Sequence, residues 1–466
     1  MELPMSDEVR EECGVLGIFN GDHLIRNITM GLYALQHRGQ ESAGFAIANG
    51  ERVRVRKSMG LVSHLVKEYN FDELSGHAVI GHVRYSTTGS STLANAQPIL
   101  VSCKWGHLAI VHNGNLTNTP EMRNEMENDG HIFLSSTDSE VLLHEIARTK
   151  AENVGEAIKI ACARLSGSFC IIFLTKDAMY VARDGFGFRP MCLGKKGKSW
   201  VIASETCALD LLDADYVRDV NPGELITIDN EGMRTDTFIT KPRKAHCIFE
   251  YVYFARPDSL IFGHSCDKIR RRIGRQLAKE CPVSADIVIA VPDSSTTAAL
   301  GYAQESKIPF EIGLLRNHYV GRTFIDPAQD VREQKVRLKF NTIDGVIKGR
   351  RVCVVEDSIV RGTTLKLICQ MIRDAGATEV HIRISSPPVA NPCFFGMDFP
   401  TSGELVASSL TPDEIGKMLG VDTLGYLSVD GLRGAAPGSP KDYCAACFDG
   451  VYPDYIPVDA NKTKCG

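Results

Sequence analysis

The first half of the chain consists of short apolar runs separated by turn residues. Runs of this length, rich in Val, Ile and Phe and bounded by Gly, Asn and Asp, predict antiparallel strands. Patterns with a helical period interrupt them, as expected for helices that cover the outer faces of antiparallel sheets. The predicted strands are 14–19, 107–115, 169–175, 178–184, 200–205 and 224–232, and the predicted helices are 29–36, 120–128, 138–148 and 154–165.

After about residue 247 the pattern changes to strand, loop, helix and strand. Apolar runs that are buried on both faces and joined by crossover helices predict a parallel sheet, which binds ligands at the carboxyl ends of its strands. One helix places Leu365, Ile368, Cys369 and Ile372 on one face and ends at Gly376. The predicted strands are 287–291, 310–315, 351–355 and 379–385, and a second predicted helix is 296–306.

The length and composition agree with two globular domains. At 466 residues the chain exceeds one ordinary core, and 44% hydrophobic with 23% charged residues is typical of globular proteins. A net charge of −5 gives no electrostatic basis for nucleic acid as a partner. The chain has no apolar run of about eighteen residues, and its start is acidic where a secretory signal would be basic. We therefore expect a cytoplasmic protein without a membrane partner.

Two acidic residues follow the strand 351–355, and a helix begins a few residues later. A helix N-terminus with a glycine and hydroxyl side chains suits a phosphate, whereas adjacent carboxylates suit ribose hydroxyls or Mg²⁺. The alternative is that Asp357 or Ser358 only caps the helix. No Gly-Lys-Ser/Thr follows, which excludes a Walker P-loop. The candidate residues are Glu356, Asp357, Ser358, Arg361, Gly362, Thr363 and Thr364.

The segment VVEDSIVRGTT resembles the phosphoribosyl pyrophosphate loop of type I phosphoribosyltransferases. Glu356 stands where that family usually has aspartate, and its extra methylene lengthens its reach. The resemblance extends to VPDSS, otherwise an ordinary turn, and implies that Asp293, Ser294 and Ser295 hold the pyrophosphate and that Ser294, Glu356 and Asp357 hold Mg²⁺. The basic segment 318–341, otherwise a solvated loop, resembles the family's lid and implies lid roles for Tyr319, Arg322, Arg332, Lys335 and Arg337.

Cys13 is a candidate nucleophile at the start of the first strand. Glutamine is a poor electrophile, and an N-terminal cysteine supplies a thiol together with an α-amine of pKa about 7.7 to 8.0 as base. Residues 1–12 must then be a propeptide that is removed. The alternative is a buried strand cysteine behind a disordered tail.

The segments ECGVLGIF, LQHRGQESAG, GHVRYSTTG, HNGNLTN and SSTDSE resemble the glutaminase domain of class II, N-terminal-nucleophile amidotransferases. Asn113 and Gly114, read as a turn after a strand, could form an oxyanion hole or be a plain hairpin turn. The resemblance implies that Arg84 clamps the glutamine α-carboxylate and that Asp138 meets the α-ammonium. Thr137 and Glu140 also predict a capping box around Asp138.

Cys444 and Cys447 form a C-x-x-C pair that by itself fits zinc, redox chemistry or neither. The resemblance adds Cys247 and Cys393 as the remaining ligands of the family's iron–sulfur subclass. It therefore implies a [4Fe-4S] cluster in preference to zinc.

Taken together, the chain resembles the glutamine phosphoribosylpyrophosphate amidotransferase family, in its propeptide-bearing, iron–sulfur subclass. The resemblance implies an α+β N-terminal-nucleophile hydrolase domain with αββα layers over 13–245. An α/β type I phosphoribosyltransferase domain with a parallel sheet and a C-terminal cysteine-containing appendage follows over 246–466. The implied reaction transfers ammonia from glutamine to phosphoribosyl pyrophosphate at the start of purine synthesis.

The family also implies a homo-oligomer, a dimer or tetramer, and purine nucleotide inhibitors. The sequence does not choose the oligomer size or the inhibitor. One alternative is another glutaminase fusion, such as a glucosamine-phosphate synthase or asparagine synthetase, which the EDSIVRGTT loop disfavours. A second is a nucleotide-sensing regulator on a phosphoribosyltransferase fold, which would have no use for Cys13, Arg84 and Asn113 together.

Overall fold

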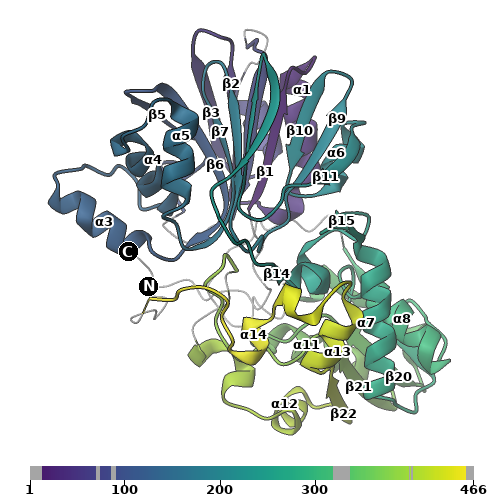
Figure 1. Ribbon diagram of the computed structural model, residues 1–466. Coiled ribbons are helices and arrows are strands. Elements are labelled where there is room, and N and C mark those ends of the chain that lie inside the picture. The colour runs from purple at the N-terminus through teal and green to yellow at the C-terminus, as the bar shows by residue number, and fades with distance from the viewer. Residues whose placement is uncertain are drawn as a thin grey trace.

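A computed structural model describes residues 13–69, 74–85, 91–317, 336–397, 399 and 402–457, and it shows two halves stacked one above the other (Figure 1). The first half contains β1 (Gly14–Phe19), α1 (Leu24–Ala34), η1 (Gln36–Arg38), β2 (Ser42–Ala48), β3 (Val53–Met59), α2 (Val62–Glu68), β4 (Ala78–Arg84), β5 (Ile99–Cys103), β6 (Gly106–Leu116), α3 (Thr119–Asn128), α4 (Asp138–Arg148), α5 (Val154–Cys162), β7 (Gly167–Leu174), β8 (Met179–Arg183), β9 (Cys192–Lys196), β10 (Ser199–Ala203), α6 (Thr206–Leu211), β11 (Asp215–Asp219), β12 (Glu224–Asp229) and β13 (Gly232–Thr237).

The first half is a sandwich of two antiparallel sheets covered by helices. One sheet has the order β11-β9-β10-β1-β4-β2-β3 and the other β13-β12-β8-β7-β6-β5. The central strand β1 is buried on both faces, since Val15 points to the second sheet and Leu16 to the layer of α1 and α6. Helices α4 and α5 cover the second sheet (Figure 1). The predicted αββα fold is confirmed.

The second half holds a parallel sheet with the order β17-β20-β21-β22, as predicted. Helices α7 and α8 cover one face of this sheet, and α11 and α12 cover the other. Its elements are β14 (His246–Cys247), the π-helix η2 (Glu250–Phe254), β15 (Leu260–Ile261), β16 (His264–Ser265), α7 (Cys266–Glu280), β17 (Ile287–Ala290), α8 (Thr296–Ser306), β18 (Leu314–Arg316), β19 (Phe340–Thr342), α10 (Asp344–Ile347), β20 (Arg351–Glu356), α11 (Thr363–Asp374), β21 (Glu379–Ile384), η3 (Ser402–Glu404), η4 (Val406–Ser408), α12 (Pro412–Leu419), β22 (Thr423–Tyr426), α13 (Val429–Ala435), η5 (Pro440–Asp442), β23 (Tyr443–Cys444) and α14 (Ala446–Asp449).

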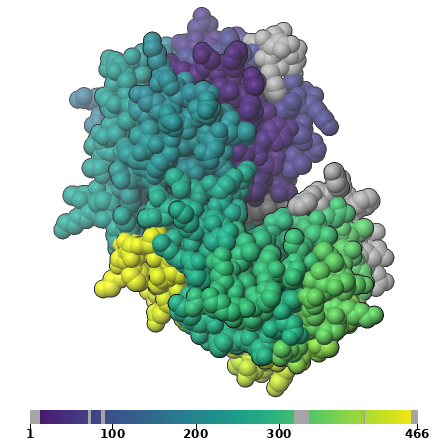
Figure 2. Space-filling model, turned by 90° about the vertical axis from the view of Figure 1, so that its right-hand side faces the viewer, coloured from purple at the N-terminus to yellow at the C-terminus, as the bar shows by residue number. Residues whose placement is uncertain are grey.

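The two halves are in contact (Figure 2), and late residues of the second half, such as Phe395 and Asp454, contact the first half. The division predicted between residues 245 and 246 falls between β13 and β14. Strand β14 pairs in parallel with β23, so the first and last strands of the second half lie side by side. No helix in the described ranges has the length and apolar character needed to cross a bilayer.

Three local predictions are wrong. The run 310–315 is no continuous strand, because Phe310 makes only an isolated bridge to Val288 and β18 begins at Leu314. Strand β6 continues through Asn113 and Gly114, so these residues lie inside a ladder and form no turn. The Thr137 side chain does not cap α4.

The Glu140 carboxylate explains the missing capping box. It accepts hydrogen bonds from the backbone N–H groups of Leu134 and Ser135, at 2.8 and 2.7 Å, and so fixes the loop before α4. The helix itself begins and ends at the predicted residues, Asp138 and Arg148.

Candidate active sites

Cys13 lies just before the central strand β1 and is 8% exposed. Its thiol donates to the Tyr85 carbonyl over 3.3 Å. Burial raises the pKa of this thiol to about 11, although the Tyr85 hydrogen bond and the Arg84 charge act in the opposite direction. The charges of Glu41 and Asp138 also act on the thiol. The structure therefore brings Arg84 and Asp138, both predicted to bind glutamine, to the predicted nucleophile.

Arg84 ends strand β4 and is 3% exposed. Its guanidinium lies 3.6 Å from the carboxylate of Glu41, which the sequence analysis did not single out. Glu41 lies in LQHRGQESAG, and an acidic residue inside a matched segment was the available signal. A guanidinium carries five N–H donors and can therefore bind more than one carboxylate, such as an α-carboxylate.

Asp138 begins α4 and accepts a hydrogen bond from the Leu116 backbone N–H over 3.0 Å. Its other oxygen lies 3.5 Å from His112 Nδ1 and accepts from the Ser139 hydroxyl. Burial opposes ionisation, but the charge and hydrogen bond of His112 together with the other hydrogen bonds outweigh it, and the Asp138 pKa lies below its usual value. Asp138 is therefore an anion at neutral pH, suited to an α-ammonium.

Asn113 and Gly114 lie on β6, in register with Cys170 and Phe169 of β7. The side-chain amide nitrogen of Asn113 is buried and has no hydrogen-bond partner among the described residues. Gly114 has φ +149°, and a Cβ there would lie 2.1 Å from the Ser168 carbonyl oxygen, so only glycine fits. An unpaired donor beside a glycine backbone is the arrangement that an oxyanion hole requires.

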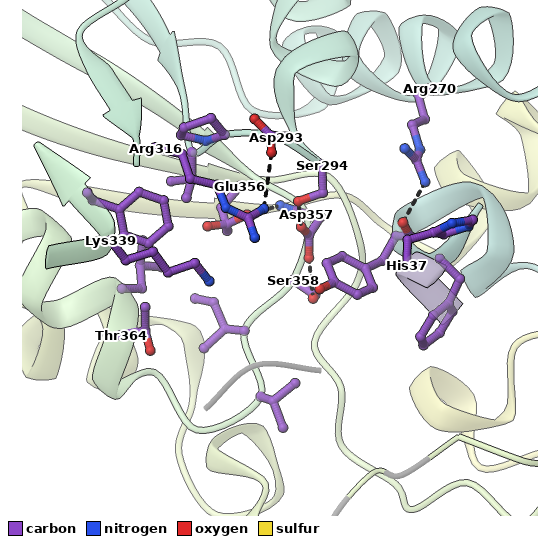
Figure 3. A pocket seen from close by; sticks show the side chains of 18 of the residues that line it. His37, Arg270, Asp293, Ser294, Arg316, Lys339, Glu356, Asp357, Ser358 and Thr364 are labelled. Atoms are coloured by element: carbon purple, nitrogen blue, oxygen red, sulfur yellow. Dashed lines mark hydrogen bonds and ion pairs between the residues drawn. The ribbon is translucent and has the colours of Figure 1, made fainter. Parts of the chain in front are cut away.

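A cavity of about 400 Å³ opens at the carboxyl ends of β17 and β20 (Figure 3). Most of its wall belongs to the second half, including Asp293, Ser294, Glu356, Asp357 and Ser358. His37 and Gln40 of the first half complete the wall. Seven of the ten residues predicted to bind phosphoribosyl pyrophosphate therefore line one cavity that faces the first half: Asp293, Ser294, Glu356, Asp357, Ser358, Gly362 and Thr364.

The two acidic residues of this cavity are held by hydroxyl groups. Ser294 donates to Asp357 over 2.6 Å, Ser295 donates to Glu356 over 2.8 Å, and Ser358 donates to Asp357 over 2.6 Å. Burial raises the pKa of both carboxyl groups, and the negative charge of Asp357 raises that of Glu356 further. Ser295 itself is fully buried beneath the cavity.

The loop between β20 and α11 positions the other predicted phosphate ligands. Gly362 is the N-cap of α11 with φ +82°, and a Cβ there would lie 2.9 Å from the Met418 methyl carbon. Gly362 and Thr364 line the cavity, whereas Thr363 and Arg361 are not among its lining residues. Arg361 lies 3.5 Å from Glu404.

Four of the five predicted lid residues lie outside the described residues: Tyr319, Arg322, Arg332 and Lys335. Arg337 is described; its side chain is exposed and lies 3.9 Å from Asp374 of α11, away from the cavity wall.

Two basic residues of the cavity were missed. Arg316 pairs with Asp293 over 3.1 Å, and Lys339 points into the cavity (Figure 3). Burial lowers the pKa of Lys339. Arg316 lies just before the predicted lid segment 318–341 and Lys339 lies within it, and their basic character was the available signal.

The four predicted cluster cysteines come together in the second half. Cys247 and Cys444 are in register on β14 and β23, and burial together with the other three thiols raises the Cys447 pKa well above its usual value. The backbone N–H of Phe395 donates to the Cys393 sulfur over 3.3 Å. As they stand, no three His, Cys, Asp or Glu side chains in the described ranges form a ligand set for a single metal ion.

Solved structures share this architecture across nearly the whole chain. One described as the allosteric regulatory enzyme of purine biosynthesis has a TM-score of 0.92 at 45% identity, covering 96% of this chain and 97% of its own. The glutamine phosphoribosylpyrophosphate amidotransferase from B. subtilis, complexed with ADP and GMP, has a TM-score of 0.91 at 45% identity, covering 96% of this chain and 98% of its own.

A family model described as a glutamine amidotransferase domain matches residues 82–211. With the sandwich fold and the second, parallel-sheet half, this defines an enzyme in which a glutamine amidotransferase domain is joined to a phosphoribosyltransferase domain. Amidophosphoribosyltransferase of Synechococcus elongatus is 46% identical over 99% of this chain and 95% of its own length, and that of Bacillus subtilis is 45% identical over 97% and 96%. The chain belongs to the amidophosphoribosyltransferase family.

Proposed function

We propose that this protein transfers ammonia from glutamine to 5-phosphoribosyl 1-pyrophosphate, giving 5-phosphoribosylamine, glutamate and pyrophosphate, in the first committed step of purine synthesis. The observation that carries the proposal is the cavity at the carboxyl ends of β17 and β20, whose wall includes His37 and Gln40 of the glutaminase half. Ammonia released in the first half thus has an acceptor site facing it, and we propose that it passes between the two sites inside the protein.

Cys13 is the proposed nucleophile after cleavage between Glu12 and Cys13. Residues 1–12, the proposed propeptide, lie outside the described residues. A thiol whose pKa is about 11 stays protonated near neutral pH, so it needs a base when it attacks. The free α-amine of Cys13, with an ordinary pKa of about 7.7 to 8.0, can accept that proton.

Arg84 and Asp138 are proposed to hold the α-carboxylate and α-ammonium of glutamine. The Asn113 amide nitrogen and the Gly114 backbone N–H would stabilise the oxyanion that forms on the side-chain amide. The buried, unpaired Asn113 donor supports this role because it has a hydrogen bond to gain in the transition state.

In the second half, Asp293, Ser294 and Ser295 are proposed to bind the pyrophosphate group. The loop that enters α11 would hold the ribose and its 5-phosphate through Glu356, Asp357, Ser358, Arg361, Gly362, Thr363 and Thr364. The proposed lid, with Tyr319, Arg322, Arg332, Lys335 and Arg337, would exclude water, which competes with ammonia for the ribose carbon.

Mg²⁺ fits the oxygen groups of Ser294, Glu356 and Asp357. Asp357 is buried and Glu356 beside it is partly buried, and the pKa values of both are raised, a cost that a bound cation relieves. Mg²⁺ usually takes only one or two carboxylates and completes its shell with water and substrate phosphate, so the protein need not supply a full ligand set. When bound, it would neutralise charge on the departing pyrophosphate.

A [4Fe-4S] cluster fits the four thiols of Cys247, Cys393, Cys444 and Cys447. Zinc would require four sulfurs at about 2.3 Å from one point, and no such set stands in the described ranges. A four-iron cluster is held by four cysteine thiolates, and the Phe395 N–H donates to the Cys393 sulfur. We expect iron and visible charge-transfer absorption in the purified protein; colourless, active protein with stoichiometric zinc would contradict this assignment.

Pyrophosphate release tests the main proposal. It should require phosphoribosyl pyrophosphate together with either glutamine or ammonia. Cys13→Ala should abolish the glutamine-dependent reaction and keep the ammonia-dependent one, and the intact mass of the wild-type protein should correspond to a chain that begins at Cys13. Loss of both activities in folded Cys13→Ala protein would refute the division of labour between the halves.

Control by purine nucleotides also belongs to this proposal. The B. subtilis relative was solved with ADP and GMP bound, and we propose that purine nucleotides inhibit this protein as well. The homo-oligomer and the cytoplasmic location stay predictions from the sequence.

A further inference from the structure

Arg38 lies behind the nucleophile and is fully buried. It ends the short helix η1, and its side chain is 0% exposed. Its Nε donates to the carbonyl oxygen of Cys13 over 3.2 Å. Cys13 itself precedes β1, whose pairing with β4 begins at Gly14 and Val83. The Arg38 hydrogen bond therefore holds the nucleophilic residue where the strand pairing does not reach.

Two buried carboxylates from different halves hold the Arg38 guanidinium. Glu205 of the first half accepts from Nη1 over 2.6 Å. Glu250, in η2 of the second half, accepts from Nη1 and Nη2 over 3.0 and 2.8 Å. Glu250 is fully buried and also lies 3.6 Å from the guanidinium of Arg189. The nucleophile is thus connected to the second half through its hydrogen bond with Arg38 and the buried Arg38–Glu250 ion pair.

A second contact from the second half reaches the oxyanion strand. The Phe395 carbonyl accepts from Arg189 Nε over 3.0 Å and from the Ser168 hydroxyl over 2.7 Å. The same Ser168 hydroxyl accepts from the backbone N–H of Asn115, which follows Gly114. Arg189 therefore joins Glu250 behind the nucleophile to Phe395 behind the oxyanion strand.

The buried ion pairs of Arg38 are better suited to positioning Cys13 than to stabilising the fold. Removing charges from water is costly, and a buried ion pair is on average no more stabilising than apolar residues of the same size. A terminal residue, however, frays unless something holds it. Once residues 1–12 are removed, Cys13 has no preceding peptide, and its carbonyl becomes the natural point of attachment. A planar guanidinium bound by two carboxylates can hold that carbonyl in one place.

We propose that Glu250 is a positioning residue for glutamine hydrolysis: acting from the second half through Arg38, it fixes Cys13 for attack. This proposal rests on the proposed function, because it presumes that Cys13 is the nucleophile. Neither residue contacts the proposed glutamine-binding groups in any described contact, so the role differs from binding. The effect should therefore fall on the turnover number for glutamine and leave its KM nearly constant.

Glu250→Gln tests the proposal because it keeps the size of the side chain and removes its charge. We expect the ratio of glutamine-dependent to ammonia-dependent kcat to fall by about tenfold to a hundredfold, since small displacements of a reacting group have effects of this size. Arg38→Lys should lower the same ratio, because one ammonium cannot reach two carboxylates and the Cys13 carbonyl together. Labelling of Cys13 by a diazoketone analogue of glutamine, followed by mass spectrometry, should slow in parallel.

Glu145→Gln is the matched control. Glu145 is also buried and paired with two arginines, Arg148 and Arg164, but it lies on α4 outside the Arg38 contacts. The ratio of glutamine-dependent to ammonia-dependent kcat in Glu145→Gln should equal that of the wild type. This result would show that losing an unrelated buried ion pair does not lower the ratio.

Three results would overturn the proposal. They are an unchanged ratio in folded Glu250→Gln protein, an equal fall of both activities, and a rise in the glutamine KM without a change in kcat. Thermal melting and the ammonia-dependent activity establish that each variant is folded. A wild-type protein without glutamine-dependent activity would instead refute the proposed function, so the two failures are distinguishable.

Discussion

Asn113 offers the most direct test of the glutaminase site, because its amide nitrogen is a buried donor without a partner in the described structure. If this donor stabilises the oxyanion, Asn113→Ala should lower the kcat for glutamine by about a hundredfold to a thousandfold, or about 2.7 to 4 kcal/mol of transition-state stabilisation. The glutamine KM should change little, because the interaction forms only in the transition state.

The same structural fact sets the expected effect on stability. Removing a hydrogen-bonded buried group leaves its partner unsatisfied and costs about 1 to 3 kcal/mol. The Asn113 nitrogen has no such partner, so Asn113→Ala should change the free energy of unfolding by less than about 1 kcal/mol from this source. Activity and stability should therefore separate, as expected where a site keeps an unsatisfied group for function.

Asn95→Ala is the control, since Asn95 is equally buried at 1% exposure but donates to the Ser136 hydroxyl over 3.0 Å. It should lose stability while its glutamine kcat stays within about threefold of the wild type. The assay is glutamate release over a range of glutamine concentrations, with ammonia-dependent pyrophosphate release and urea unfolding measured on the same preparations. A near-normal kcat in Asn113→Ala, or an equal loss of both activities, would refute the reasoning.

Three further predictions follow from single contacts. Arg84→Lys should raise the glutamine KM about tenfold or more, because an ammonium cannot bind a carboxylate with two parallel hydrogen bonds. Glutamate release at increasing glutamine concentrations measures this KM. Gly362→Ala should raise the KM for phosphoribosyl pyrophosphate in the ammonia-dependent assay, because φ +82° and the Met418 methyl disfavour a Cβ. Burial alone would raise the Glu205 pKa, but the charges and hydrogen bonds of His37 and Arg38 hold it well below its usual value. Ionised Glu205 therefore stabilises the fold above about pH 4.3, which is its pKa in the unfolded chain. This stabilisation is lost as the pH falls below that value. Urea unfolding of Glu205→Gln should accordingly depend less on pH below about 4.3 than the wild type, and parallel pH profiles would count against this account.

Local periodicity predicted part of the fold, and it did not single out the buried strands β2 and β4 or the long helix α7. Strand β1 is buried along its whole length, so its apolar run is unbroken, and α4 and α8 begin and end where the pattern does. The strand predicted over 310–315 was wrong because its apolar residues fit the strand pattern but have no continuous partner strand. The turn predicted at Asn113 and Gly114 was wrong because the pairing of β6 with β7 outweighs the turn preference of the Asn-Gly sequence.

The chemistry at the two sites was recognisable where the residue types alone carry it. The acidic pair at 356–357 was recognisable from its residue types and its position between a strand and a helix, whereas the roles of Cys13 and Asp138 followed from the resemblance to class II amidotransferases. Arg38 lies in the matched segment LQHRGQESAG, but its pairing with Glu250 was not predicted, since the two residues are 212 positions apart. Their contact exists only because the two halves stack, which no local pattern encodes.

The contacts that the second half makes behind the glutaminase site also bear on the order of synthesis. A ribosome completes strand β1 and its cysteine long before it reaches Glu250, and it adds Phe395 later still. The carboxylate of Asp454, which accepts from the Gly167 backbone N–H over 2.7 Å, comes among the last described residues. A nascent chain that has released only its first half thus lacks the groups that hold both the nucleophile and the oxyanion strand from behind. If glutamine hydrolysis needs those groups, the growing polypeptide does not hydrolyse glutamine. Ammonia is then first released when the acceptor domain is present to receive it.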